Sequence, residues 1–227
     1  LAEAPIGKLA EVLQHLPPDD LADLIGDVPE AQRAQLMALL DRESKEELET
    51  LLKYSPDSAG GIMTTEFFAL PHSLSVEEAI QNIRSREDVE MVFYLYLVDE
   101  AGKLVGVVSL RQLLIARPGT LLHSIMNRRV IKVTTDTDQV RVAMLVDKYH
   151  LLAMPVVDAE DVLVGMVTVD DVLEVMEEET TRDMLKMAGT SESETLTHSA
   201  FKIAWIRLPW LLAAFVVEVP SAWNTVR

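Results

Sequence analysis

A long internal repeat in residues 56–176 constrains the fold of this chain more than any other feature of its sequence. Both copies open with an Ile-Met dipeptide, at 62–63 and at 125–126. Both close with a Leu-Val-Gly strand pattern that runs into a predicted helix, at 104–114 and 163–173. The chain therefore contains two copies of one structural unit.

Each copy has the residue order of a small α/β unit. Asp99 and Asp158 follow short apolar runs and open hairpin turns before the Leu-Val-Gly strands. The periodicity around them predicts strand, helix, strand, turn, strand and helix in both copies. We expect the two copies to pack around a pseudo-two-fold axis.

Residues 1–54 predict a set of short stacked helices. Pro17 and Pro29 are twelve residues apart, and Leu24 and Leu36 repeat the same spacing. Each unit begins at a proline and places apolar residues at helical spacing. Such units cannot bury their apolar faces alone, so they should stack into a helical superhelix. Because the chain begins with leucine rather than methionine, we expect this array to be cut from a longer protein.

Charge and composition exclude several classes of function. The net charge of -17 would repel a phosphate polyanion, so we expect no nucleic-acid partner. The chain has no cysteine, which excludes disulfides and cysteine-ligated metals. Its five histidines are scattered, so no zinc site is expected. No nucleophile, base and orienting residue form a catalytic pattern, and we expect no enzyme.

Three features in series resemble one family. The order of elements in 56–176 resembles a tandem pair of CBS domains. The junction at 55–64 resembles the junction between the N domain and the CBS pair of MgtE-type magnesium transporters. Residues 167–173, which run into an acidic helix, resemble the start of that family's plug helix. The resemblance implies a homodimeric, magnesium-sensing region on the cytoplasmic side of the cell membrane, with Mg²⁺ as its ligand.

The fold class that the resemblance implies is α+β multidomain. It comprises an N-terminal α-helical superhelix, a tandem CBS α/β pair, and a long acidic C-terminal connecting helix that leads to a truncated transmembrane segment. The expected boundaries are 1–54 for the truncated N domain, 55–118 and 119–174 for the CBS repeats, 170–195 for the plug or connecting helix, and 200–219 for the start of the first transmembrane helix. The resemblance also implies a membrane pore domain of the same polypeptide, which we expect to lie outside this chain.

The apolar run at 201–217 allows two interpretations. A membrane span needs roughly 20 apolar residues, but Arg207 interrupts this run, and Glu218 and Pro220 stop it. A buried C-terminal helix or an interfacial anchor would explain these features. We favour the beginning of a first transmembrane helix, because the resemblance places a membrane domain here.

Carboxylates in two stretches are candidate ligands for Mg²⁺, which prefers carboxylate and water oxygens. In the first stretch, Asp19 and Asp23 are four residues apart and share one helix face. Helix capping by Asp19 or Asp20 is the alternative interpretation, whereas Asp23 lies too deep in the helix to cap it. We expect these carboxylates to face acids of another domain across a bound ion.

The second stretch is one predicted helix that is dense in acids, and its candidate ligands are Asp170, Asp171, Glu174, Glu178, Glu179 and Asp183. A charge run of this kind is usually a solvated face. Here basic residues come only at the end, at Arg182 and Lys186, so we expect the acids to lack basic partners. The resemblance places the plug-helix acids of the family on Asp171, Glu179 and Asp183, and Arg182 stands where an acid is expected.

Asp138, just before the predicted helix of the second copy, is a further candidate metal ligand. Capping of that helix is the alternative role for its side chain. The resemblance places Asp138 near the interface with the partner subunit.

Tandem CBS domains often bind adenine nucleotides such as ATP between the repeats, so the resemblance also implies a nucleotide site. It places Tyr94 where a side chain stacks on adenine and Arg111 where one meets phosphates. Gln112 stands in place of the acid that usually binds ribose. Tyr94 as a core residue and Arg111 as a surface charge are the alternative.

One main hypothesis and two alternatives follow. At low Mg²⁺, repulsion among the acids favours a splayed state, and at high Mg²⁺, bound ions bridge the acids so that the connecting helix closes the pore. The first alternative is an adenine-nucleotide-sensing CBS module of an enzyme or another transporter. The second is a structural dimerisation module whose shape does not depend on Mg²⁺.

Overall fold

The computed structural model describes residue 13 and residues 16–85 and 93–187. The chain divides into two units, residues 1–173 and 174–227, and helix α9 (Val169–Met187) begins in the first unit and continues into the second. The expected transmembrane segment 200–219 and the end of the expected connecting helix lie outside the described residues. Among the described helices, none combines the length and apolar character that crossing a bilayer requires.

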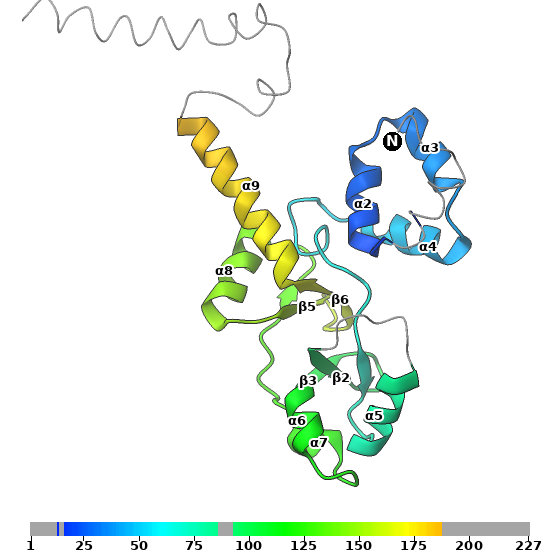
Figure 1. Ribbon diagram of the computed structural model, residues 1–227, viewed down its shortest axis with the longest axis vertical. Helices are drawn as coiled ribbons and strands as arrows, with labels where there is room; N and C mark the ends of the chain where they lie inside the picture. The colour runs from blue at the N-terminus through cyan, green and yellow to red at the C-terminus, as the bar shows by residue number, and fades with distance from the viewer. Residues whose placement is uncertain (1–12, 14–15, 86–92, 188–227) are drawn as a thin grey trace, which may run out of the picture. The chain divides into compact units, whose positions relative to one another are not determined.

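Three short helices make up the described N-terminal part of the first unit (Figure 1), namely α2 (Pro18–Asp27), α3 (Glu30–Met37) and α4 (Arg42–Leu51). As predicted, prolines start the first two, because Pro17 and Pro29 hold the N-cap positions with a fixed φ. Helix α4 begins differently: the Asp41 side chain accepts a hydrogen bond from the Ser44 amide at 2.8 Å.

The N-terminal helices bury apolar side chains that follow the helical period. Leu21 and Ile25 of α2 are buried, as are Leu48 and Leu51 of α4, and α2 and α4 pack against each other. Neither helix could bury this face alone, which is the physical reason why the short units stack.

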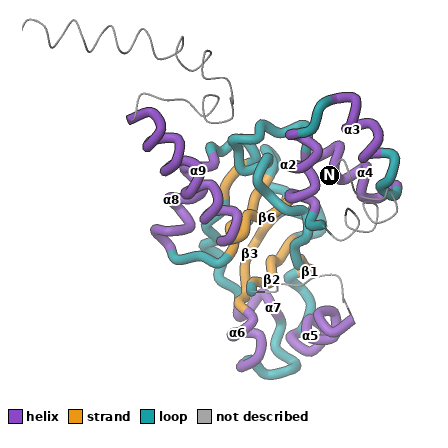
Figure 2. The backbone as a smooth tube through the Cα atoms, turned by 45° about the horizontal axis from the view of Figure 1, so that its top comes forward, coloured by secondary structure: helices purple, strands orange, loops and turns teal. Residues whose placement is uncertain are grey.

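The internal repeat forms two three-stranded sheets of the same topology. Their strands are orange in Figure 2. In each sheet the first strand pairs parallel with the second, and the second pairs antiparallel with the third. The strands are β1 (Ala69–Pro71), β2 (Tyr94–Val98) and β3 (Leu104–Ser109) in the first copy, and β4 (Val133–Thr134), β5 (Ala153–Val157) and β6 (Leu163–Thr168) in the second. The helices of the two copies are α5 (Val76–Ser85), α6 (Leu110–Ile115), α7 (Leu122–Ile125) and α8 (Gln139–Tyr149), followed by α9. The repeat predicted from the sequence is thus confirmed.

The hairpin turns of the two copies pair with each other. The Leu104 amide donates to the Asp161 carbonyl at 3.1 Å, and the Leu163 amide donates to the Gly102 carbonyl at 3.1 Å. Leu104 and Leu163 are equivalent positions of the repeat, and so are Gly102 and Asp161. The two bonds are therefore related by a pseudo-two-fold axis between the copies.

The Ile-Met segment that opens each copy lies on the sheet of the other copy. Thr64 and Met166 exchange two backbone hydrogen bonds of 2.9 and 3.0 Å, and Asn127 and Val107 do the same. The sequence order assigns each segment to the copy that it precedes, and the structure shows an exchange instead. An exchange of this kind leaves no trace in the hydrophobic pattern, because both sheets offer the same edge.

A linker holds the N-terminal helices to the second copy. The Ala59 and Gly60 amides donate to the Thr137 and Thr135 carbonyls at 2.6 and 2.9 Å. A side chain at Gly60 would place Cβ 2.6 Å from the Tyr54 ring, so only glycine permits this approach. The linker therefore brings α2 and α4 to the copy that ends in α9.

Gly106 and Gly165 face the exchanged segments, and a side chain at each glycine would meet different atoms. A Cβ at Gly106 would lie 2.4 Å from Met126 Sδ, and its other close neighbours also belong to that flexible side chain. A Cβ at Gly165 would lie 2.6 Å from Met63 Sδ and 2.8 Å from the Thr64 carbonyl oxygen, which belongs to the backbone. We expect Gly106→Ala and Gly165→Ala each to lower the free energy of unfolding by about 1–3 kcal/mol, measured by urea denaturation.

Replacing the contacting methionine with alanine should change the destabilisation by Gly106→Ala more than that by Gly165→Ala. In a Met126→Ala background, Gly106→Ala should cost much less, because Sδ and Cγ, the two nearest atoms, are gone and only Cβ remains at 3.1 Å. In a Met63→Ala background, Gly165→Ala should keep most of its cost, because the Thr64 carbonyl remains. Relief at neither site would contradict the exchange of segments, and full relief at both would contradict the contact of Gly165 with the Thr64 carbonyl.

Candidate functional site

Asp19 lies buried in the first turn of α2, where its side chain is 9% exposed. Asp20 is exposed in the same turn, and Asp23 is exposed one turn later. The alternative interpretation, that Asp19 or Asp20 is the N-cap of this helix, is wrong: Pro17 holds the N-cap position, without a side-chain capping hydrogen bond. Both acids still benefit from the positive end of the helix dipole.

The environment of Asp19 disfavours its ionised form. Burial is the largest cause, and the negative charge of Asp171 is the next, so that the pKa of Asp19 rises to about 7. The charge of Asp20 raises it further, while the backbone amides of Asp19 and Asp20 oppose the rise. Asp19 Oδ1 is buried and has no hydrogen-bond partner among the described residues.

Asp171 meets this group from the first turn of α9. Its Oδ2 accepts hydrogen bonds from the Thr168 amide at 3.0 Å and from the Thr168 hydroxyl. Burial raises the pKa of Asp171, the two bonds from Thr168 oppose the rise, and the charges of Asp170 and Asp20 add to it. Among the described residues, the neighbouring charges that shift the pKa values of Asp19 and Asp171 are therefore carboxylates.

The structure thus brings together acids that are far apart in the sequence, at the point where α2 approaches the start of α9. One carboxylate oxygen, Asp19 Oδ1, is removed from water without gaining a donor from the described part of the chain, which is costly unless a proton or a cation binds there. Among the described residues, no group of three or more histidines or acids is arranged to hold a metal ion by itself. An ion that keeps several water ligands, as Mg²⁺ does, suits such an incomplete set.

Asp138 has a structural role that explains its position. Its Oδ1 accepts hydrogen bonds from the Val140 amide at 3.0 Å and the Arg141 amide at 3.2 Å, which makes it the N-cap of α8. The capping role is thus confirmed, and a metal role for Asp138 stays a prediction.

The later acids of α9 belong to the second unit. Glu174 and Glu178 are exposed. Arg182 donates to Glu179 at 2.8 Å, and Lys186 donates to Asp183 at 3.1 Å. The expectation that these acids lack basic partners is wrong for Glu179 and Asp183, because the spacing i, i+3 places acid and base side by side on a helix.

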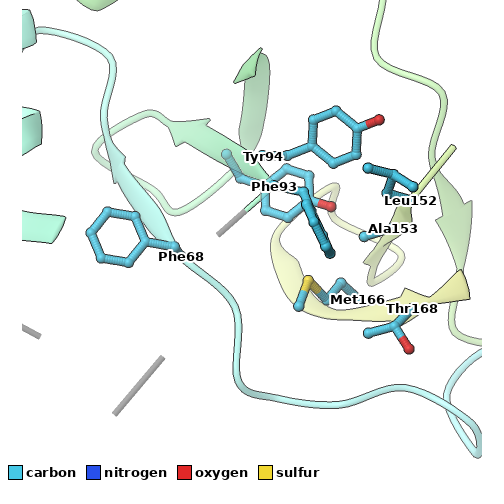
Figure 3. Close-up of a pocket in the computed structure, with 8 residues that line it drawn as sticks. Phe68, Phe93, Tyr94, Leu152, Ala153, Met166 and Thr168 are labelled. Carbon is cyan, nitrogen blue, oxygen red and sulfur yellow. The ribbon is translucent and has the colours of Figure 1, made fainter. Parts of the chain in front are cut away.

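A second candidate site is a cavity between the two sheets of the repeat. The residues that line it come from both copies, and they are Phe68, Phe93, Tyr94, Tyr96, Leu152, Ala153, Met166 and Thr168. Figure 3 shows Phe93 and Tyr94 of the first copy facing Leu152, Ala153 and Met166 of the second. The walls are therefore largely aromatic and aliphatic.

The structure treats the two predicted nucleotide residues differently. Tyr94 lines the cavity, whereas Arg111 is exposed on α6 and is not among the described lining residues. Gln112 has a local role, since its Oε1 accepts hydrogen bonds from the Ser109 amide and hydroxyl, both at 2.9 Å, in a capping box. Sequence reasoning missed Tyr96, although its spacing from Tyr94 places both on one face of a strand.

Comparisons with known proteins agree with this architecture. Residues 1–57 match the model of the MgtE intracellular N domain, and residues 59–119 and 122–178 each match the model of the CBS domain. The magnesium transporter MgtE of Thermus thermophilus is 42% identical over 238 residues, which cover 92% of this chain and 53% of that protein. The magnesium transporter MgtE of Bacillus subtilis is 34% identical over 204 residues, covering 89% of this chain and 45% of that protein. The chain thus spans about half the length of the curated relatives that it matches.

Solved structures show the same relationship. The cytosolic domain of the Mg²⁺ channel MgtE in complex with ATP is 45% identical, with a TM-score of 0.74 over 75% of this chain and 71% of that one. The soluble part of a magnesium transporter is 37% identical, with a TM-score of 0.75 over 78% of this chain and 70% of that one. The chain therefore belongs to the MgtE family, and it carries the intracellular N domain and the tandem CBS domains of that family.

Proposed function

We propose that this chain is the cytosolic, magnesium-sensing region of a magnesium transporter, in which Mg²⁺ bridges acids of α2 and α9. The observation that carries the proposal is Asp19: a buried carboxylate with acidic neighbours and one oxygen without a described donor. The names of the relatives support the choice of ion, since they are magnesium transporters and a Mg²⁺ channel. The chain is not an enzyme, since three relatives that cover most of its length are magnesium transporters and CBS domains are regulatory rather than catalytic.

The physical basis is a change of sign in one electrostatic interaction. Two carboxylates at about 4 Å repel by up to about 4 kcal/mol at an effective dielectric constant of about 20. A divalent cation between them turns that repulsion into attraction, and Mg²⁺ can do so through its own water shell. Asp19 and Asp171 would form the first bridge, with Asp20 beside them.

The remaining candidate acids would extend the bridging when the region closes. We assign this role to Asp23, Asp170, Glu174, Glu178, Glu179, Asp183 and, towards a partner subunit, Asp138. Because Glu179 and Asp183 already have basic partners, Mg²⁺ would have to displace Arg182 and Lys186 there. We therefore expect these two acids to contribute less than Asp19 and Asp171.

Closure of the pore would follow from the position of α9 in the chain. We propose that α9 belongs to a connecting helix, 170–195, between the CBS pair and a first transmembrane helix that starts in 200–219. The region would then lie on the cytoplasmic side of the cell membrane and bias the pore towards its closed state when Mg²⁺ is bound, as a population shift. The family matches at 1–57, 59–119 and 122–178 support the proposed boundaries 1–54, 55–118 and 119–174.

A homodimer through the helices of the CBS pair is part of the proposal. Large apolar side chains are exposed on the first unit, at Leu114 (67%), Ile115 (68%), Met144 (59%) and Leu173 (61%). In a monomer these side chains would stay exposed to water, whereas a second copy would cover them.

We also propose that an adenine nucleotide binds in the cavity between the sheets. The aromatic and aliphatic lining supports this, and so does the ATP complex of the similar cytosolic domain. Nucleotide sensing without a response to Mg²⁺ is the alternative function. A change of shape with ATP in EDTA, and none with Mg²⁺ alone, would favour that alternative.

The bridging proposal predicts how one neutral substitution changes compaction. The wild-type chain should become more compact and more resistant to proteases as Mg²⁺ rises to about 20 mM, a range suited to a weak carboxylate site. Asp19→Asn removes the repelling charge, so the variant should be more compact than wild type without Mg²⁺ and respond less to it. Small-angle scattering measures both effects.

Glu49→Gln is the matched control, because it removes the same charge from an exposed position of α4. It should leave the response to Mg²⁺ unchanged. An equal response in wild type and Asp19→Asn would contradict the role of Asp19, and no response in wild type would contradict magnesium sensing.

The raised pKa of Asp19 predicts a pH dependence of stability in EDTA. The usual pKa of an aspartate is 3.8, and in the folded chain that of Asp19 is about 7, so the folded state binds the proton more tightly than the unfolded state. The stabilisation from protonated Asp19 is full below about pH 4 and is lost as pH rises towards 7, at about 1.4 kcal/mol per pKa unit. Urea denaturation should show this loss as the difference between wild type and Asp19→Asn. A difference that does not vary between pH 4 and 8 would count against the buried, acidic setting of Asp19.

The proposed dimer predicts the effect of a charge on α6. Ile115→Lys places a cation on the exposed apolar face and should shift the chain from dimer to monomer without unfolding it. Sedimentation velocity measures the assembly, and circular dichroism measures the fold. Gln35→Lys adds the same charge at an exposed position of α3 and should leave the dimer intact. A dimer that survives Ile115→Lys unchanged would exclude this face.

A further inference from the structure

Tyr96 places an unpaired hydroxyl in the interior of the first unit. The residue lies in the middle of β2 and is 1% exposed. Its Oη is buried and has no hydrogen-bond partner among the described residues. Burial raises the pKa of Tyr96, and the charge of Tyr94 adds to this rise, so the hydroxyl keeps its proton and can donate it. A buried donor without a partner destabilises the protein that contains it.

The fold does not require a hydroxyl at this position. Tyr96 packs among buried apolar side chains of both copies, such as Leu104, Ala153 and Met166. In the second copy the equivalent strand position is Pro155, since Tyr96 pairs with Val107 in β3 as Pro155 pairs with Met166 in β6. A phenylalanine would fill the same space without the cost of an unpaired donor, so the hydroxyl calls for an explanation outside the folding of the unit.

The cavity between the sheets supplies that explanation. Tyr96 is one of its lining residues, together with aromatic Phe68, Phe93 and Tyr94. Another lining hydroxyl, that of Thr168, is already committed to Asp171. At the edge of the cavity, Phe93 is 40% exposed and Leu152 is 42% exposed, so a bound ring would cover apolar surface there.

We propose that Tyr96 Oη donates a hydrogen bond to a ring nitrogen of the adenine base, and that Tyr96 thereby determines which ring the cavity accepts. This inference rests on the proposed binding of an adenine nucleotide in the cavity. Adenine has flat faces that suit aromatic and aliphatic walls, and its ring nitrogens accept hydrogen bonds at the edge. A hydroxyl that the described residues leave unpaired would gain a partner when such a ring is present, which makes the bond a source of specificity.

Tyr96→Phe removes the hydroxyl and keeps the ring. Isothermal titration with ATP in magnesium-free buffer should show binding weakened by about 3- to 10-fold, the worth of one neutral hydrogen bond. Without nucleotide, the variant should be at least as stable in urea as wild type, because an unpaired buried donor is gone. A structural role for the hydroxyl predicts the opposite pair of results, namely lower stability and unchanged affinity, which would overturn the inference.

Tyr94→Phe is the matched control, since it removes a hydroxyl from the neighbouring lining tyrosine and keeps its ring for stacking. It should change the affinity for ATP less than Tyr96→Phe does. An equal or larger loss in Tyr94→Phe would shift the selecting role to Tyr94 and overturn the inference.

Analogues of ATP that lack one ring nitrogen identify the accepting atom. One of the 1-deaza, 3-deaza and 7-deaza compounds should bind the wild-type chain more weakly than ATP binds it. The same compound and ATP should bind the Tyr96→Phe variant with equal affinity. If no analogue loses its penalty in Tyr96→Phe, the hydroxyl does not read the base, even though ATP binds. If wild type binds no ATP at all, the nucleotide proposal fails and this inference with it, while compaction by Mg²⁺ remains a separate measurement.

Discussion

Thr64 and Met166 exchange two backbone hydrogen bonds, and the arrangement of the first unit depends on this pairing. Thr64 lies at the end of the linker that follows α4. Met166 lies on β6, and α9 begins directly after this strand. The segment that follows the N-terminal helices therefore pairs with the edge of β6, the strand that directly precedes the acidic helix. Met63 reinforces the arrangement, because its side chain fills the space that glycine leaves at position 165. Through this single edge, the first turns of α2 and α9 become neighbours.

The same edge explains why Asp19 and Asp171 converge, and the described charges that shift their pKa values are acidic. Asp19 and Asp171 each lie in the first turn of a helix, where the dipole favours negative charge. The dipole of each helix stabilises the acid in its own first turn. Where the two helix ends come together, however, two carboxylates of the same charge become buried. The raised pKa values of both carboxylates express this conflict. A proton or a cation would resolve it, and in the proposed function a hydrated divalent ion does so without a complete cage of protein ligands. The fold thus places buried, mutually repelling carboxylates where the binding of Mg²⁺ would relieve their repulsion.

The cavity between the sheets arises from the pairing of two copies that are not identical. The copies share topology and register, but the first brings aromatic side chains to the cavity and the second brings Leu152, Ala153 and Met166. Two equal copies would form equal clefts on both sides of the pseudo-two-fold axis. The difference between Tyr96 and Pro155 at one strand position gives this cleft a polar atom of its own.

The sequence alone determined the internal repeat, the proline-initiated helices and the family, because these depend on local pattern: the period of apolar residues, the residues that start helices, and motifs in a given order. It also pointed to Asp19 and Asp171 as candidates. Only the tertiary structure decided that these two acids meet, that Glu179 and Asp183 have basic partners, that Asp138 caps a helix, and that Tyr96 lines the cavity. The exchange of the opening segments was equally hidden, since two copies of one pattern offer two equivalent sheet edges. The reason is the same in each case: burial and the charge of neighbours are properties of the packed chain, and they set the chemistry of a side chain whose identity the sequence already states.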